Sequence, residues 1–183
     1  MELGSEYQIE PEEVPQQKEV KKKSTIKKII IGIIVVIIAL GIGGFLLFRN
    51  LIAERESINV ETFVAVMEEN GYTTIDATYQ VEYDFVRLIV LALEENHQFE
   101  FWEFDYSENA RFAFLDIRNG LEATIVGSYS SSFINGRNFD TYRLTTDGRY
   151  HQILRVENIM IYSWGPSNYR NDIRALFRIL ENR

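Results

Sequence analysis

The sequence predicts an α+β domain with one antiparallel sheet, preceded by an N-terminal transmembrane helix. An uncharged apolar run fills residues 29–48. Beyond it, three segments repeat apolar residues at helical spacing, and six others have strand character and are separated by short turns. The order helix, two strands, helix, four strands, helix is typical of an antiparallel sheet with helices packed on it. We therefore expect a hairpin plus a four-stranded meander, packed with three helices.

Residues 29–50 are expected to be the transmembrane helix. The run 29–48 is twenty residues long, and at about 1.5 Å per residue it spans about 30 Å, the thickness of a bilayer's hydrocarbon core. A cleavable signal peptide has a short basic leader and a small-residue cleavage site. Here the preceding region is 28 residues long and carries six glutamates, and no such site follows closely. We expect the segment to be retained as a signal anchor that binds the lipid bilayer.

The basic residues near the two ends of this segment predict its direction. Six lysines precede it, whereas only Arg49 and Arg55 follow closely. The positive-inside rule then places the N-terminus in the cytoplasm. Residues 1–28, rich in Glu, Gln, Lys and Pro, are expected to be a disordered cytoplasmic tail. Residues 51–183 are expected to form one extracytoplasmic domain of a single-pass cell-membrane protein, and the absence of cysteine suits a Gram-positive surface.

Three helices are expected in the domain, at 59–70, 107–119 and 168–182. Asn59 is a plausible N-cap of the first and Gly71 a plausible stop, while Ser107 and Gly120 are assigned the same roles in the second. The third repeats apolar residues at the spacing i, i+3, i+4, i+7, namely Ile173, Leu176, Phe177 and Leu180.

The strands are expected as a hairpin and a meander. "YDFVRLIVLAL" and "QFEFWEFD" form the hairpin around "EENH", and the meander uses 126–134, 138–146, 149–156 and 159–164. The meander's turns are predicted at Asn135-Gly136, Asp147-Gly148 and Glu157-Asn158. Asn-Gly and Asp-Gly supply the positive φ angles of tight hairpins.

The layout resembles a group of uncharacterised single-pass membrane-anchored proteins of Gram-positive bacteria with a small extracellular α+β domain. The shared pieces are an "F…MEENGY" helix, a "QFEFWEFD"-like strand, an acidic-capped helix and a "NGRNFDTYRLTTDGRY…RVENIMIY" meander. The resemblance covers residues 58–183. It implies a membrane-anchored module, but no catalytic residue and no ligand.

Glu103 and Asp105 are the candidate catalytic residues. Alternate residues of a strand share a face, so the two carboxylates would be neighbours, as glycoside hydrolysis requires, with Trp102 able to stack on a sugar. This is the alternative function, a glycosidase-like envelope hydrolase. A bulge or strand end that puts both acids in solvent is the stronger interpretation.

Other chemistry has little support in the sequence. The chain has only two histidines, His97 and His151, no cysteine, and none of the glycine-rich nucleotide or serine-hydrolase motifs. We expect surface histidines, no metal, no cofactor and no enzymatic activity. From residue 51 onward, 12 arginines face 21 acidic residues, a balance that disfavours nucleic acid.

The expected function is therefore an extracytoplasmic binding module for a protein or an envelope polymer, of undetermined oligomeric state. If the three helices share one sheet face, the other face stays open around 138–156. Its aromatic and charged residues, Phe139, Tyr142, Arg143 and Leu144, are the candidate binding residues. A stripe of Arg170, Arg174 and Arg178 on the last helix either holds an anionic polymer or lipid headgroup or, as we favour, is a solvated face suited to a helix C-terminus.

Overall fold

The computed structural model describes residues 35–41, 45, 53–81 and 84–182. The chain divides into two compact units, 1–48 and 49–183. In the first, residues 35–41 and 45 are helical, and the predicted tail and most of the predicted span lie outside the described residues. Within the described part of the chain, no helix combines the length and apolar character needed to cross a membrane.

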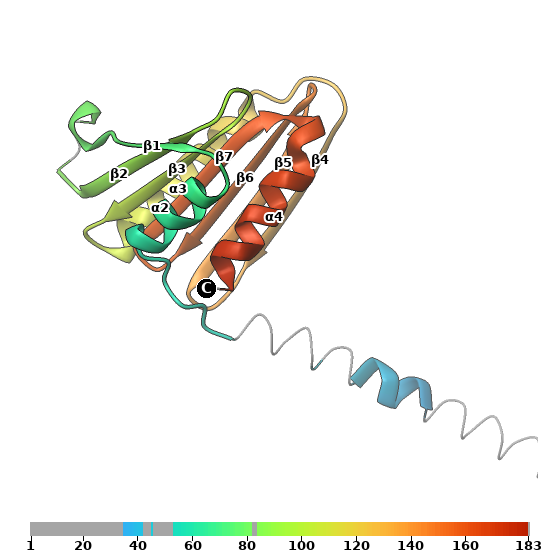
Figure 1. Ribbon diagram of the computed structural model, residues 1–183. Helices are drawn as coiled ribbons and strands as arrows, with labels where there is room; N and C mark the ends of the chain where they lie inside the picture. The colour runs from blue at the N-terminus through green and yellow to red at the C-terminus, as the bar shows by residue number, and fades with distance from the viewer. Residues whose placement is uncertain (1–34, 42–44, 46–52, 82–83, 183) are drawn as a thin grey trace, which may run out of the picture. The chain divides into compact units, whose positions relative to one another are not determined.

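The second unit is an α+β domain built on one seven-stranded antiparallel sheet (Figure 1). The strand order is β1-β2-β3-β7-β6-β5-β4. The strands are β1 Thr73–Asp76, β2 Val86–Leu93, β3 Gln98–Phe104, β4 Tyr129–Asn135, β5 Phe139–Thr146, β6 Arg149–Val156 and β7 Ile159–Pro166. The predicted antiparallel sheet is confirmed, and the pairing of β3 with β7 joins the hairpin to the meander. The sequence did not predict β1, because its four residues are mostly exposed and show no alternation.

Three helices accompany the sheet: α2 Val60–Glu69, α3 Ser107–Ala123 and α4 Arg170–Glu181, with short 3-10 turns at Thr78–Gln80 and Ser167–Tyr169. The predicted caps of α2 are confirmed. The Asn59 side chain accepts a hydrogen bond from the Thr62 N–H at 2.7 Å. Gly71 has φ 88°, and the Tyr72 N–H donates to the Met67 carbonyl at 3.0 Å, as in a Schellman motif.

Two predictions about α3 are wrong. Ser107 is the first helical residue and not the N-cap, which is Tyr106, without a capping side-chain hydrogen bond. Gly120 does not end the helix, which continues to Ala123. The reason is packing, since Ile117 and Leu121 extend the apolar stripe of α3 for another turn against the sheet.

The turns of the meander follow the prediction in full at two of three places. Asp147 and Gly148 have φ angles of 46° and 72°, and Glu157 has 53°. The chain also turns after Asn135, as predicted, but the positive φ angles expected of Asn135-Gly136 are wrong, because neither residue has one. A longer loop forms there, in which the Gly136 N–H donates to the Phe139 carbonyl at 2.8 Å. A Cβ at Gly136 would lie 2.1 Å from the Phe139 ring, so packing and not φ requires this glycine.

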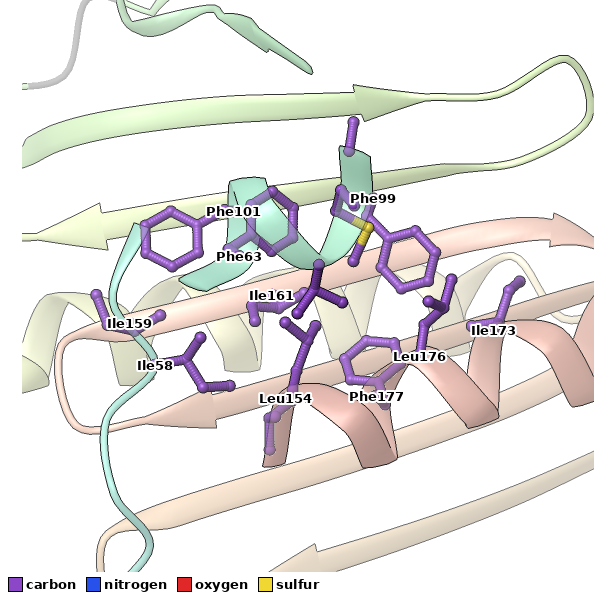
Figure 2. Packing of buried hydrophobic residues seen from close by; sticks show 14 of the residues in the cluster. Ile58, Phe63, Phe99, Phe101, Leu154, Ile159, Ile161, Ile173, Leu176 and Phe177 are labelled. Carbon is purple, nitrogen blue, oxygen red and sulfur yellow. The ribbon is translucent and has the colours of Figure 1, made fainter. Parts of the chain in front are cut away.

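The three helices do not share one sheet face, which corrects the expected open face. Helices α2 and α4 cover one side, and α3 covers the other (Figure 1). On the α2/α4 side, Phe63 contacts Phe101 and Phe99 contacts Phe177, with ring centroids 5.2 and 5.5 Å apart (Figure 2). On the α3 side, a second cluster gathers Phe104, Ala110, Phe114, Tyr142, Leu144, Ile153 and Met160.

Candidate functional site

Three of the four predicted binding residues lie inside the domain. Phe139, Tyr142 and Leu144 are only 2%, 1% and 1% exposed. Phe139 belongs to the cluster under α2 and α4, and the other two belong to the cluster under α3. A partner on an open face of β5 is therefore excluded, because helices cover the strand on both sides. Arg143 is the one member of the set that reaches a surface hollow.

The two candidate carboxylates are both neighbours of one arginine. Asp105 Oδ1 lies 2.6 Å from Arg87 Nε, and Glu103 Oε1 lies 3.9 Å from Arg87 Nη1. The pairing of β2 with β3 shifts in register between Val86 and Leu88, and Arg87 is the extra residue of β2 at this point. Trp102 packs with the α3-side cluster, on the sheet side opposite to Glu103. The structure thus brings the acids together as partners of a cation, away from the expected stacking ring.

Both histidines are buried, which corrects the expectation of surface histidines. His97 lies between the Tyr72 hydroxyl and Glu94, whose Oε2 is 2.9 Å from its Nδ1, and it stacks on Tyr169. His151 Nδ1 lies 2.9 Å from the Tyr162 hydroxyl. Neither has further metal-type ligands, and no group of three or more such residues occurs in the described ranges.

One hollow of the domain lies at the beginning of α3 and has mixed charge. Its volume is about 550 Å³, and its lining includes Asp105, Glu108, Glu157, Arg111, Arg137 and Arg155. Arg155 is bound to Asp140 at 2.6 Å, and Arg137 Nε lies 3.1 Å from Glu54. Since acids balance the arginines and two arginines are already paired, this hollow has little capacity for another charged group.

A second hollow, of about 150 Å³, is lined by arginines and hydroxyls without any carboxylate. We call it the arginine hollow, and it is formed by Ser130, Ser131, Ser132, Arg143, Thr145, Tyr150, Arg170 and Arg174. It lies where the strands β4, β5 and β6 meet the first two turns of α4.

The register of the sheet explains the position of Arg143. Arg143 pairs with Ser132 of β4 and Gln152 of β6, and the next same-face row pairs Thr145 with Ser130 and Tyr150. Alternate residues share a face, so these hydroxyls and the guanidinium lie on the α4 side of the sheet.

Helix α4 supplies the other two cations. Its buried residues, Ile173, Leu176, Phe177 and Leu180, fix which stripe faces the sheet. Arg170 and Arg174 are four residues apart and therefore lie one turn apart along one side of the helix. Packing of α4 brings this pair to Arg143, although they are far apart in sequence.

Among the residues that the structure describes, the three guanidinium groups have no acidic partner. No ion pair to Arg143, Arg170 or Arg174 is formed by the described residues, and the buried Nε of Arg143 donates no hydrogen bond. Burial raises the pKa of the Tyr150 phenol, and the positive charges of Arg143, Arg174 and Arg170 oppose that rise. The Tyr150 hydroxyl donates to Gln152 Oε1 at 2.8 Å.

The helix dipole does not account for this charge. Arg178 lies in the last turn of α4, where a cation is favourable, as the interpretation of a solvated stripe requires. Arg170 is the first residue of α4, where the dipole is already positive. Asp172 supplies one negative charge in the first turn of α4. Three arginines line the arginine hollow, so an added anion is favourable there.

No protein-family model matches the chain, and no curated protein matches it. Among solved structures, a GTP binding regulator from Thermotoga maritima is similar, with 14% identity, 67% of this chain and 87% of that chain covered, and a TM-score of 0.41.

Proposed function

We propose that this chain is a membrane-anchored binding module of the cell envelope, without catalytic activity. Residues 29–50 hold it in the bilayer, and the domain outside the cytoplasm binds a protein or envelope polymer through an oxyanion group. The membrane placement is supported by the uncharged run 29–48 and by the six lysines that precede it.

The observation that carries the binding role is the unpaired cationic lining of the arginine hollow. Arginine presents its N–H groups in a fork that fits carboxylate and phosphate oxygens. An oxyanion in the hollow offsets the charges of Arg143, Arg170 and Arg174, all three of which line it.

The same lining supports binding rather than catalysis. A serine hydroxyl becomes a nucleophile when a neighbouring base takes its proton. The lining has serine hydroxyls and guanidinium groups, and it includes no histidine, aspartate or glutamate. These groups hold an anion but provide no base.

Titration of the full-length chain in detergent with inorganic phosphate and with acetate tests the site. We expect saturable binding that weakens as chloride concentration rises, because chloride screens the charges and competes for them. Arg143→Gln and Arg174→Gln should each reduce the affinity. Arg178→Gln is the matched control on the same helix and should leave it unchanged. Equal affinity of all three variants would show that the hollow is not the binding site.

The proposed membrane topology can be tested separately from the binding site. Protease added to intact protoplasts should remove the domain 51–183 and leave the tail 1–28 protected. Protection of the domain would contradict the proposed direction, and a mature protein lacking residues 1–50 would contradict the retained anchor.

A further inference from the structure

The edge of the sheet beside the arginine hollow is open. Strand β4 stands last in the strand order and pairs with β5 alone among the described strands. Its pairing with β5 is regular over seven residue pairs, from Tyr129 to Asn135. Its outer edge therefore presents backbone N–H and C=O groups in the spacing that another strand can pair with.

Most edge strands carry features that prevent such pairing, and β4 carries none of them. Charged side chains, proline, bulges and short length are the usual devices. The sequence of β4, "YSSSFIN", has no charge and no proline, and its register has no bulge. At the other edge, β1 has four residues and ends with Asp76, so it is protected by its length and its charge.

We propose that the ligand is an extended peptide that adds to the edge of β4 as an eighth strand and places a carboxylate in the arginine hollow. This inference rests on the proposed function, since it uses the same three arginines. It adds the class of ligand and the way in which the ligand is held.

The hollow and the edge share residues, which connects the two parts of the proposal. Ser130 and Ser132 belong to the edge strand and line the hollow. An added strand lies about 4.8 Å from β4, and its alternate side chains point to the α4 side. An aspartate or glutamate at such a position, or a terminal carboxylate, lies next to Arg143, Arg170 and Arg174.

The side chains of β4 on the α3 side of the sheet indicate which residues should flank the acidic residue of the peptide. Tyr129 and Phe133 lie on the α3 side of β4 and are 59% and 45% exposed. Phe133 contacts Phe114 of α3, with ring centroids 6.0 Å apart. Residues on either side of the acidic one point to this face, where apolar side chains would cover both rings. The recognised pattern is apolar–acidic–apolar.

Three synthetic peptides test this inference on the full-length chain in detergent. Each has the length of β4, seven residues, with blocked termini and one central residue between valines. The central residue is glutamate in the first peptide and glutamine in the second. The third has the glutamate and is N-methylated at alternate backbone positions. We expect the first to bind saturably and the second about ten- to hundredfold more weakly, because the charge-assisted hydrogen bonds are lost.

The third peptide tests strand addition, because it keeps the carboxylate and loses backbone donors. We expect it to bind no better than acetate. Arg174→Gln should lower the affinity for the glutamate peptide to that for the glutamine peptide, and Arg178→Gln should not.

The two proposals fail in different ways. Binding of acetate or phosphate with no gain from the glutamate peptide, or equal binding of the N-methylated peptide, overturns the edge-strand inference and keeps the anion site. A dimer by sedimentation that leaves no peptide binding also overturns it, since a second copy then occupies β4. If neither the small anions nor the peptide binds, both proposals are overturned.

Discussion

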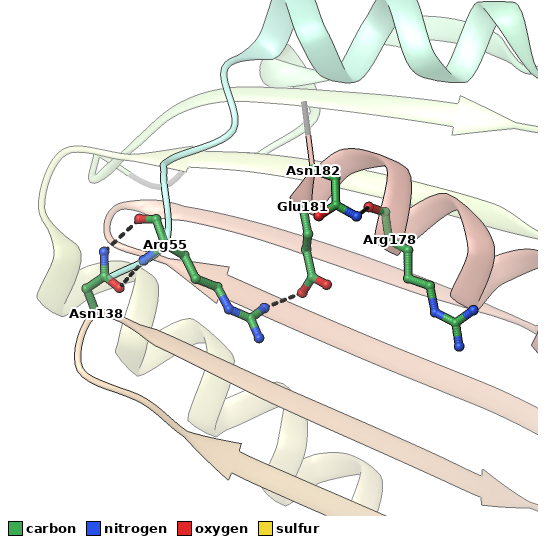
Figure 3. A network of polar contacts seen from close by, with 5 residues as sticks. All are labelled: Arg55, Asn138, Arg178, Glu181 and Asn182. Carbon is green, nitrogen blue, oxygen red and sulfur yellow. Dashed lines mark hydrogen bonds and ion pairs between the residues drawn. The ribbon is translucent and has the colours of Figure 1, made fainter. Parts of the chain in front are cut away.

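Arg55 and Asn138, 83 residues apart in sequence, exchange two hydrogen bonds (Figure 3). The Arg55 N–H donates to Asn138 Oδ1 at 2.9 Å, and Asn138 Nδ2 donates to the Arg55 carbonyl at 2.9 Å. The Arg55 guanidinium also pairs with Glu181 and lies 3.7 Å from the Phe139 ring centroid. These contacts bind the segment before α2 to the β4–β5 loop and to the end of α4.

Replacing Asn138 with alanine should destabilise the domain by about 1–3 kcal/mol, because it removes both hydrogen bonds and leaves the Arg55 backbone groups without them. Urea unfolding of the full-length chain measures this loss. Asn96→Ala, in an exposed turn, is the matched control and should change stability by less than about 0.5 kcal/mol. Equal effects would show that the pairing with Arg55 adds nothing.

Breaking the buried ion pair of Asp140 and Arg155 should lower the free energy of unfolding more than removing the Asn138 side chain does. Its atoms lie 2.6 Å apart, and the side chains are only 2% and 8% exposed. Asp140→Asn leaves a buried guanidinium without its counter-charge, and a loss of about 3–5 kcal/mol is expected in urea unfolding. Glu54→Gln removes the partner of Arg137 in an exposed pair and should cost less than about 1 kcal/mol. The double variant Asp140→Leu/Arg155→Met should recover part of the loss, because it leaves no charge buried.

Two glycines should respond to alanine with opposite signs. Gly120 is inside α3, and a Cβ there meets nothing within 4 Å, so Gly120→Ala should stabilise the domain by about 0.5–1 kcal/mol. At Gly165 a Cβ would lie 2.5 Å from the Cβ of His97, and Gly165→Ala should destabilise by about 1–3 kcal/mol. Thermal unfolding of the two variants beside the parent chain checks the signs, and a shift of the same sign in both would contradict the packing described.

His151 should make stability depend on pH. Burial, and then the charge of Arg149, lower the pKa of the His151 imidazole below its usual 6.5. The unfolded chain therefore binds this proton more readily, so stability is greatest above the unfolded pKa and falls as pH falls through the folded pKa. His151→Asn, which can keep a hydrogen bond to the Tyr162 hydroxyl, should flatten the curve of unfolding temperature between about pH 7.5 and 5. An unchanged slope would assign the pH dependence to other groups.

Hydrophobic periodicity and the residues at turns were enough to predict most of the helices and strands. The α2 caps follow from Asn59 and Gly71, and the turn at Asp147-Gly148 follows from the positive φ angles that such pairs adopt. The local sequence does not indicate which face of the sheet each helix covers. The stripe of α3 and that of α4 look alike, and only the tertiary arrangement sends them to opposite sides of the sheet. Gly120 and Gly136 were misassigned for the same reason, because packing and not local φ decides their roles.

The arginine hollow was predictable only in fragments. Arg143 was singled out on its strand, and Arg170 and Arg174 on their helix, but no local pattern relates a strand residue to a helix more than twenty-five residues later. One signal was present in the sequence: Arg170 stands at the beginning of α4, where a cation is unfavourable. Charge placed against a helix dipole is a reason to look for an anion.

The contacts of Arg55 also determine the direction in which a pulling force would act on the domain. Strand β5 begins at Phe139, under the Arg55 guanidinium, and ends at Thr146, next to the arginine hollow. The proposed ligand in the hollow and the proposed anchor, which precedes Arg55 in the chain, would therefore pull on opposite ends of β5 and of α4. Tension then runs along the strands, so the hydrogen bonds between β4, β5 and β6 are loaded together in shear rather than opened one after another.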